Sequence, residues 1–267
     1  MKTKIIISTD CALNGPWHNP DDALALAYIL QNPNVEVISI ITTFGNTSEK
    51  NVYNSITKLS NELGNEPHIV RGARDKYDNC NDIKAYFNHN TDVNDCLLLS
   101  IGPTTNLARI PSAVLNSFNR IIVMGGSLST GNIPPFFTKE FNFWKDHKST
   151  SQIINNNREI ELIPLDSTKK TYLSKSLIDK VTNKWPILGK KINDWDIFHG
   201  SIYFSPSNPH DLVAAILATN PEKFIVADTK IKSLNGRLIN DKNGFTHKIC
   251  EAKNPDDLIE SIFLTNN

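Results

Sequence analysis

Short apolar runs rich in β-branched residues recur along the chain up to Pro164, and turn residues bound each of them. These runs have no polar side, which is typical of parallel strands buried on both faces. The pattern therefore predicts five such strands, at Lys4–Ser8, Val35–Thr43, Cys96–Ile101, Arg120–Met124 and Glu159–Pro164.

Segments with helical spacing separate the apolar runs. Glu49–Leu63 is the clearest, because its apolar residues recur at intervals of three and four positions and so share one face. Three further helices are expected at Asp21–Leu30, Asn106–Leu115 and Asp211–Ala218. Alternating strands and helices predict an α/β fold with an open, mostly parallel, Rossmann-like sheet covered by helices on both faces. With no linker or repeat, a single domain over residues 1–267 is expected.

Three segments lack this regularity. Arg74–Asp95 is polar and is expected to form a loop or an irregular helix, and Ser127–Thr138 is expected to be irregular. Trp185–Pro209 is expected to be a long aromatic-bearing loop, either a lid over a site or a cover for the core. Near the C-terminal end, Asn235-Gly236 and Asn243-Gly244 predict two hairpin turns.

Composition restricts the classes of partner. The chain has 267 residues, 39% of them hydrophobic, and its 28 Lys and Arg balance its 28 Asp and Glu. Without net charge there is no general field to attract nucleic acid or an acidic membrane, and neither partner is expected. No apolar stretch is long enough for a signal-peptide core or a membrane span. The four cysteines have no metal-ligand spacing, so a reduced, cytoplasmic protein is expected.

Polar residues gather where the predicted strands end. In open parallel sheets, ligands bind at the carboxyl ends of the strands, so these residues are the candidates for chemistry. They include the Gly-Pro-Thr-Thr-Asn segment after Ile101 and the Met-Gly-Gly segment at Met124. The remaining candidates are Asp10, Asp21, Asp22, Asn46, Asn132, Glu140, Asn142, His210 and Asp211.

Four carboxylates in this set, Asp10, Asp21, Asp22 and Asp211, would repel one another unless a positive charge lies between them. No Lys or Arg recurs among the candidates, so a divalent cation is the simplest answer. Oxygen ligands without cysteine or paired histidine favour Ca²⁺ or Mg²⁺ over zinc. The alternative is that Asp21 and Asp22 only complement the dipole of the helix that they open.

At these positions the chain resembles the inosine-uridine-preferring nucleoside hydrolase family. STDCALNGPWHNPDDALALAYIL is similar to the family's N-terminal fingerprint, an Asp-rich turn leading into an Asp-Asp-Ala-Leu-Ala helix. Six further blocks follow in family order, from about residue 4 to about residue 227 in all. They are VEVISIITTFGNTSEKNVYNSITKL, IGPTTNLAR, RIIVMGGSLSTGN, EFNFWKDHKSTSQII, LIPLDST and NPHDLVAAIL.

The resemblance implies a function and a site. It implies calcium-dependent hydrolysis of the N-glycosidic bond of ribonucleosides, with a small-molecule nucleoside as substrate and a homodimer or homotetramer as assembly. Calcium ligands are implied at Asp10, Asp22, Asp211 and the backbone carbonyl of Ile101. Asp10 is implied as the base that takes a proton from water. His210 can protonate the leaving nucleobase, or it has only a structural role next to a helix cap. The implied ribose contacts are Asp21, Asn46, Asn132, Glu140 and Asn142.

The chain departs from the family pattern in places. Ser8 stands where an Asp is usual, and a longer loop joins Asp10 to Asp21, with Trp17 and His18 either stacking on a base or packing over the site. The Arg74–Asp95 region is shortened and lacks the His-Gly-x-x-Gly-Leu stretch.

Two alternatives to this enzyme remain. One is a catalytically silent relative that senses a nucleoside or ribose. The other is a phosphatase of the haloacid-dehalogenase kind, which is disfavoured because Ala12 stands where a second Asp is needed. The chain contains no P-loop and no GxGxxG motif, so the sequence does not indicate an enzyme that uses ATP or NAD.

Overall fold

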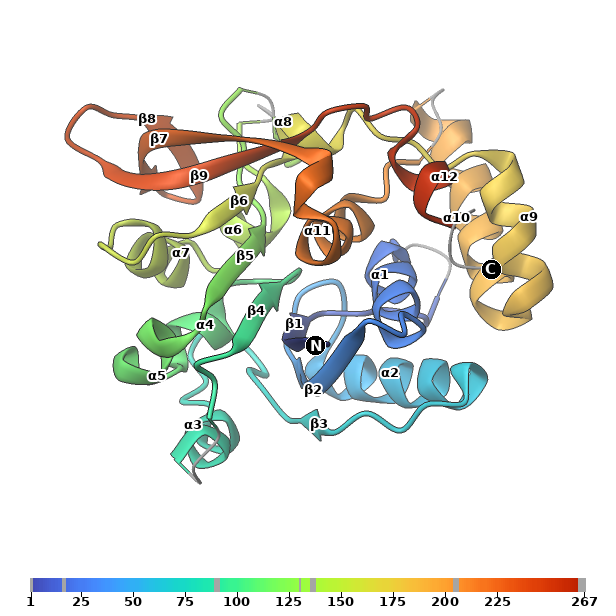
Figure 1. The fold of residues 1–267 in the computed structure, drawn as a ribbon, viewed down its shortest axis with the longest axis horizontal. Helices are drawn as coiled ribbons and strands as arrows, with labels where there is room; N and C mark the ends of the chain where they lie inside the picture. The colour runs from blue at the N-terminus through green and yellow to red at the C-terminus, as the bar shows by residue number, and fades with distance from the viewer. Residues whose placement is uncertain are drawn as a thin grey trace.

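A computed structural model describes residues 2–15, 18–88, 92–129, 131–134, 138–203 and 207–263. In these residues one sheet has the strand order β3-β2-β1-β4-β5-β6-β9-β7-β8 (Figure 1). Neighbouring strands from β3 through β9 pair in parallel, whereas β7 pairs antiparallel with both β9 and β8. The expected open, mostly parallel sheet is confirmed. The strands are β1 Thr3–Thr9, β2 Val35–Thr42, β3 Ile69–Val70, β4 Cys96–Ser100, β5 Arg120–Met124, β6 Glu161–Ile163, β7 Phe224–Leu234, β8 Arg237–Asn240 and β9 Phe245–Ala252.

Helices cover both faces of the sheet, as the strand pattern predicts (Figure 1). Within β1, Ile5 and Ile7 pack into one hydrophobic cluster and Ile6 into the other, because successive side chains point to opposite faces. The first face carries α1 Asp21–Leu30, α2 Glu49–Leu63, α9 Lys175–Lys184, α10 Pro186–Tyr203, α11 His210–Thr219 and α12 Leu258–Phe263. The second carries α3 Asn81–Asn88, α4 Thr105–Arg109, α5 Ser112–Ser117, α6 Phe141–Lys145 and α7 His147–Ile154. Two short helices, α8 Leu165–Thr168 and the 3₁₀ helix η1 Pro221–Lys223, follow β6 and α11.

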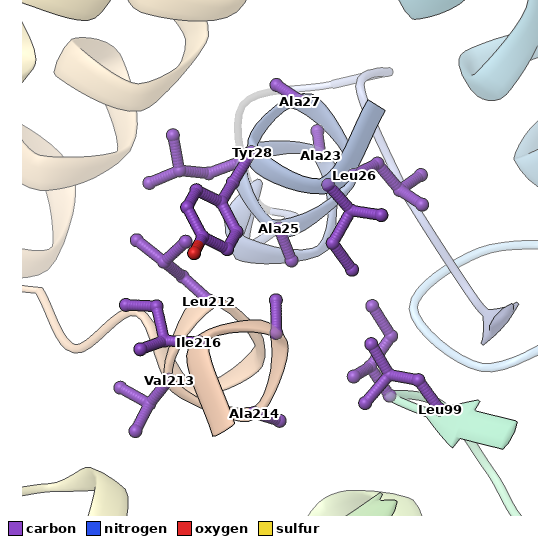
Figure 2. Packing of buried hydrophobic residues seen from close by; sticks show 14 of the residues in the cluster. Ala23, Ala25, Leu26, Ala27, Tyr28, Leu99, Leu212, Val213, Ala214 and Ile216 are labelled. Carbon is purple, nitrogen blue, oxygen red and sulfur yellow. The ribbon is translucent and has the colours of Figure 1, made fainter. Parts of the chain in front are cut away.

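The helices α1 and α11 lie side by side on the first face (Figure 2). Buried side chains lie between them, among them Ala25 of α1 and Leu212 of α11. Tyr28 of α1 points toward α11, and its hydroxyl bonds Thr219 Oγ1 over 2.7 Å and Asn220 Oδ1 over 3.0 Å. Hydrogen bonds therefore join the C-terminal ends of the two helices, and their N-terminal ends lie together at one edge of the sheet.

The prediction of a loop at Trp185–Pro209 is wrong, because most of this segment forms α10. Pro186 is at the first helical position, where proline is tolerated, so it begins the helix and does not interrupt it. Leu188 and Ile192 are one turn apart and buried in the first-face core. The carboxylate of Glu62 on α2 accepts the N–H groups of Ile187 and Leu188 and so caps the helix from elsewhere in the chain.

Smaller differences follow from local chemistry. The single helix expected at Asn106–Leu115 is two helices, because Pro111 holds Ile110 extended. Arg74–Asp95 contains the regular helix α3 after an irregular stretch. Asn235-Gly236 does make the β7–β8 hairpin, with φ of 52° and 78°. Asn243-Gly244 makes a turn but no hairpin, since β8 and β9 both pair with β7. In the described residues no helix is long and apolar enough to cross a membrane.

Candidate metal and substrate site

Four acidic side chains meet at the carboxyl edge of the sheet, and all are buried. Asp10 follows β1, Asp21 and Asp22 open α1, and Asp211 is in the first turn of α11. The last three each offer an oxygen within 4.8 Å of the others, a spacing that suits one metal ion. This triple includes Asp21, which was expected to contact sugar, and does not include Asp10. We refer to all four residues as the acidic cluster.

Asn46 links Asp10 to the rest of the acidic cluster. Its backbone N–H donates to Asp10 Oδ2 over 2.6 Å, and its side-chain amide donates to Asp22 Oδ2 over 3.1 Å. Thr9 donates its hydroxyl to the other oxygen of Asp22 over 2.5 Å. Asp10 Oδ1 is buried and has no hydrogen-bond partner among the described residues. A buried carboxylate oxygen without a donor is costly unless a cation or water satisfies it.

Two glycines let the backbone approach Asp10. A Cβ on Gly45, after β2, would lie 2.0 Å from Asp10 Oδ2, and one on Gly102, after β4, would lie 2.8 Å from Oδ1. Ile101, whose carbonyl was expected to bind calcium, precedes Gly102, and its N–H donates to the carbonyl of Ser8 over 2.9 Å. The segment that carries the expected backbone ligand therefore lies against the β1 end that carries Asp10.

Burial raises the pKa of every carboxylate in the acidic cluster, and the neighbouring negative charges add to this effect for Asp10, Asp21 and Asp211. The pKa of Asp21 is raised to about 7 and that of Asp22 to about 6. Without a counterion the cluster resists full ionisation near neutral pH. An all-oxygen donor set with this excess of negative charge fits a hard divalent cation.

Glu140 and Asn142 lie at the end of β5, next to the Met-Gly-Gly segment. Glu140 caps α6 by accepting the N–H groups of Asn142 and Phe143 over 2.8 and 3.0 Å, and it also accepts that of Gly126 over 2.9 Å. Burial raises the pKa of Glu140 to about 7. The side-chain amide of Asn142 faces the carbonyl of Met124 at 3.4 Å. Both predicted sugar contacts are thus fixed to the sheet edge.

Asn132 is exposed, and the loop that carries it is described at residues 131–134 and from residue 138 onward. The backbone N–H of Asn132 donates to the carbonyl of Lys139 over 2.9 Å, so the loop folds back on itself ahead of α6. The long loop after Asp10 is similar: His18 contacts the carbonyl of Asn14, while Trp17 lies outside the described residues.

His210 is the first residue of α11 and directly precedes Asp211. Its Nδ1 lies 2.7 Å from the hydroxyl of Thr168 at the end of α8. Burial, together with the positive charge of Lys169 and the nearby His199, lowers the pKa of His210 to about 3. The imidazole is therefore neutral at physiological pH, and it can act as a hydrogen-bond donor without carrying a charge.

Residues 5–260 match the family model described as inosine-uridine preferring nucleoside hydrolase. The chain belongs to this family. Its members are enzymes that act on N-glycosyl compounds. The chain is 22% identical, over 295 aligned positions, to the pyrimidine-specific ribonucleoside hydrolase RihB of Escherichia coli, with 94% of this chain and 91% of the relative covered.

Solved structures share the fold of this nucleoside hydrolase. A purine-preferring ribonucleoside hydrolase from Gardnerella vaginalis superposes with a TM-score of 0.85 at 18% identity, covering 99% of this chain and 98% of the other. An inosine-uridine preferring nucleoside hydrolase from Bacillus anthracis superposes with a TM-score of 0.78 at 18% identity, covering 99% of both chains. The names of these relatives include pyrimidine and purine specificities, so the shared fold does not assign a nucleobase.

The groups that hold the site residues in place could not be recognised from the sequence. Thr9 and Thr168 bond Asp22 and His210, but a threonine beside a strand end or in a short helix carries no distinctive signal. Ser8 is buried and accepts a hydrogen bond from Asn106 over 2.9 Å. Ser8 therefore supports the strand ends. Among the described residues, the carboxylate oxygens that lie close enough together to hold a metal ion come from Asp21, Asp22 and Asp211.

Proposed function

We propose that the protein hydrolyses the N-glycosidic bond of ribonucleosides, giving ribose and a free nucleobase, and that it requires Ca²⁺. The single observation that carries this proposal is the acidic cluster itself, four buried carboxylates with the unpartnered Asp10 Oδ1, in a chain of a nucleoside hydrolase family. The residues that would hold the ion are Asp10, Asp22, Asp211 and the backbone carbonyl of Ile101, with Asp21 close enough to share it.

A bound divalent cation supplies charge neutralisation and lowers the pKa of water in its vicinity. Asp10 then accepts the proton of the attacking water at Oδ1, the oxygen without a protein donor. Asn46 holds the other oxygen of Asp10 and keeps Oδ1 aimed away from the backbone amide. This arrangement gives the base a fixed position without depending on a high intrinsic basicity.

The ribose would be bound by the polar residues around the acidic cluster. Their oxygens stabilise the positive charge that develops on the sugar as the glycosidic bond breaks. His210 donates a hydrogen bond to the departing nucleobase as a neutral imidazole, which agrees with its lowered pKa. The residues proposed to contact ribose hydroxyls are Asp21, Asn46, Asn132, Glu140 and Asn142.

We also propose a cytoplasmic location and a homodimer or homotetramer. The four cysteines are free and buried, which suits a reducing compartment. The assembly is proposed from the family resemblance alone.

The test is a panel of purine and pyrimidine ribonucleosides incubated with the protein and Ca²⁺, with release of reducing sugar as the readout. We expect release that stops with EDTA, returns with added Ca²⁺ and is lost in Asp10→Ala. Asp82→Asn, a change at an exposed carboxylate on α3, is the matched control and keeps activity. Silence across the panel, with thermal stabilisation by a nucleoside, would instead indicate a binding protein without catalysis.

A further inference from the structure

A cavity of about 300 Å³ is lined in part by residues of α4 and α7. Figure 1 shows these two helices away from the pair α1 and α11. Three segments form the cavity: the stretch after β3, the end of α4 and the start of α7. None of the acidic cluster lines this cavity. The residues that matter for its chemistry are Lys76, Tyr77, Arg109, Asp146, His147 and Lys148.

Three cationic side chains and one carboxylate line this cavity. In the part of the chain that the structure describes, no ion pair involves Lys76, Arg109 or Lys148. The carboxylate, Asp146, is buried and already engaged, since it accepts the hydroxyl of Thr105 over 2.7 Å and the N–H of Ser149 over 3.1 Å. In a chain with no net charge, this local excess of positive charge makes the cavity a site for an anion.

Arg109 is fixed in place and organises the wall of the cavity. Its Nε donates to the carbonyl of Asp78 over 3.1 Å, and its Nη2 donates to the carbonyl of Lys76 over 3.3 Å. A guanidinium has five N–H donors, so donors remain for a ligand after these two bonds. Because the guanidinium is already held, little side-chain freedom is lost when an anion binds.

An aromatic ring stands beside these cations. Tyr77 is 75% exposed, and the ammonium of Lys76 lies 5.2 Å from its ring centroid. The backbone N–H of Tyr77 donates to Asp75 Oδ1 over 2.7 Å, which fixes the turn that carries the ring. An exposed ring next to a cationic cavity is suited to stacking with a nucleobase while the cations bind its phosphate.

We propose that this cavity binds a phosphate group, either free phosphate or the phosphate of a nucleoside monophosphate. Arg109 supplies the fixed guanidinium, Lys76 and Lys148 supply ammonium groups, and His147 adds a further donor. The volume of about 300 Å³ is at the small end for ligand pockets and suits a phosphate with part of a sugar. A nucleobase would then extend over Tyr77.

The test is calorimetric titration of the full-length protein with inorganic phosphate and, separately, with adenosine 5′-monophosphate, in buffer with a low calcium concentration and again in EDTA. Binding at the cavity is the same in both buffers, because no residue of the acidic cluster lines it. We expect the double variant Lys76→Ala/Lys148→Ala to weaken both probes by about 10- to 100-fold, since each lysine supplies a charge-assisted hydrogen bond.

Two further variants complete the test. Lys58→Ala/Lys180→Ala removes the same charge from exposed positions on α2 and α9 and leaves affinity within about twofold. Tyr77→Ala weakens only the nucleotide, by about 10-fold, if a base stacks there. If Tyr77→Ala leaves the affinity for adenosine 5′-monophosphate unchanged and wild type binds both probes equally, the ligand is free phosphate. The proposal is overturned if neither probe binds, if the double variant binds like wild type, or if the control pair loses as much affinity.

Discussion

The backbone N–H of Asp211 donates to Oδ2 of Asp21 over 3.3 Å, although 190 positions separate the two residues along the chain. The contact ties the first turn of α11 to the first turn of α1. It holds two of the buried carboxylates close together without the help of a metal ion. The acidic cluster therefore depends on the packing of these two helices as much as on its own side chains.

Loss of the Tyr28 hydroxyl should weaken that packing at the opposite ends of the helices. Tyr28→Phe removes hydrogen bonds to Thr219 and Asn220 in a largely buried contact. We expect a loss of about 1–2 kcal/mol in the free energy of unfolding, measured by chemical denaturation. Tyr172→Phe, at a 47% exposed ring, should change it by less than about 0.5 kcal/mol. Equal stability of wild type and Tyr28→Phe would mean that the helix pair does not need this link.

Calcium should stabilise the wild-type protein and stabilise Asp22→Asn much less. At a concentration of 100 times its Kd, a ligand that binds only the folded state adds about 2.7 kcal/mol. In EDTA, Asp22→Asn should be more stable than wild type. The variant removes one buried charge from an acidic cluster in which several carboxylates lie close together. Thermal melts with and without calcium measure both effects. Calcium stabilisation of Asp22→Asn equal to that of wild type would exclude Asp22 as a ligand.

The position of the acidic cluster at the sheet edge follows from a topological rule that the sequence is enough to apply. Strands β1 and β5 begin and end within a residue or two of their expected bounds, and α1 begins at Asp21 as expected. Parallel strands place their carboxyl ends at one edge, so Asp10 and the N-termini of α1 and α11 had to meet there. The rule therefore places these residues together although they are far apart in the chain, and it requires no information about side-chain contacts.

What the sequence could not predict depends on partners supplied from a distance. The helix α10 begins at a proline, and its cap is Glu62 from another helix, which no local pattern reveals. Asn46 donates its backbone and side-chain N–H groups to Asp10 and Asp22, two contacts that the sequence did not predict beside the sugar contact proposed for this residue. The turn at Asn243-Gly244 has the right residues for a hairpin, yet the strands on either side of it find another partner in β7.

A methyl group at Gly45 should displace the proposed base. The added Cβ of Gly45→Ala would lie 2.0 Å from Asp10 Oδ2, and Asp10 is fully buried, so either the carboxylate or the loop must shift. A displacement of about 1 Å can cost about 100-fold in rate, and we expect a fall in kcat of that order. Overpacking should also cost about 1–3 kcal/mol in stability.

The control for Gly45→Ala is Gly64→Asn. Gly64 ends α2 with a φ of 66°, and a Cβ there would meet nothing within 4 Å. Asparagine tolerates this left-handed conformation, so kcat should not change. Wild-type kcat in Gly45→Ala would show that the position of Asp10 is not critical for the reaction.

The contribution of His247 to stability should fall in mild acid, and this residue lies outside the acidic cluster. The ring is fully buried on β9, its Nε2 lies 2.8 Å from the carbonyl of Ile154 at the end of α7, and Nδ1 has no partner among the described residues. Nε2 therefore carries the proton and donates it to that carbonyl, and a second proton on Nδ1 would have no acceptor. Burial lowers the pKa of His247 below its ordinary value of about 6.5.

The unfolded chain therefore binds a proton at His247 more readily than the folded protein does. The stability contributed by the neutral ring is complete above pH about 6.5 and is lost as the pH falls below that value toward the lower folded pKa, at up to about 1.4 kcal/mol per pH unit. His247→Gln has no such proton to bind, while every carboxylate is common to both proteins. Urea denaturation of both in EDTA from pH 8 to pH 5.5 should thus show the stability advantage of wild type shrinking with acid. A difference that stays constant over this range would mean that the buried ring takes up its proton as easily as an unfolded one.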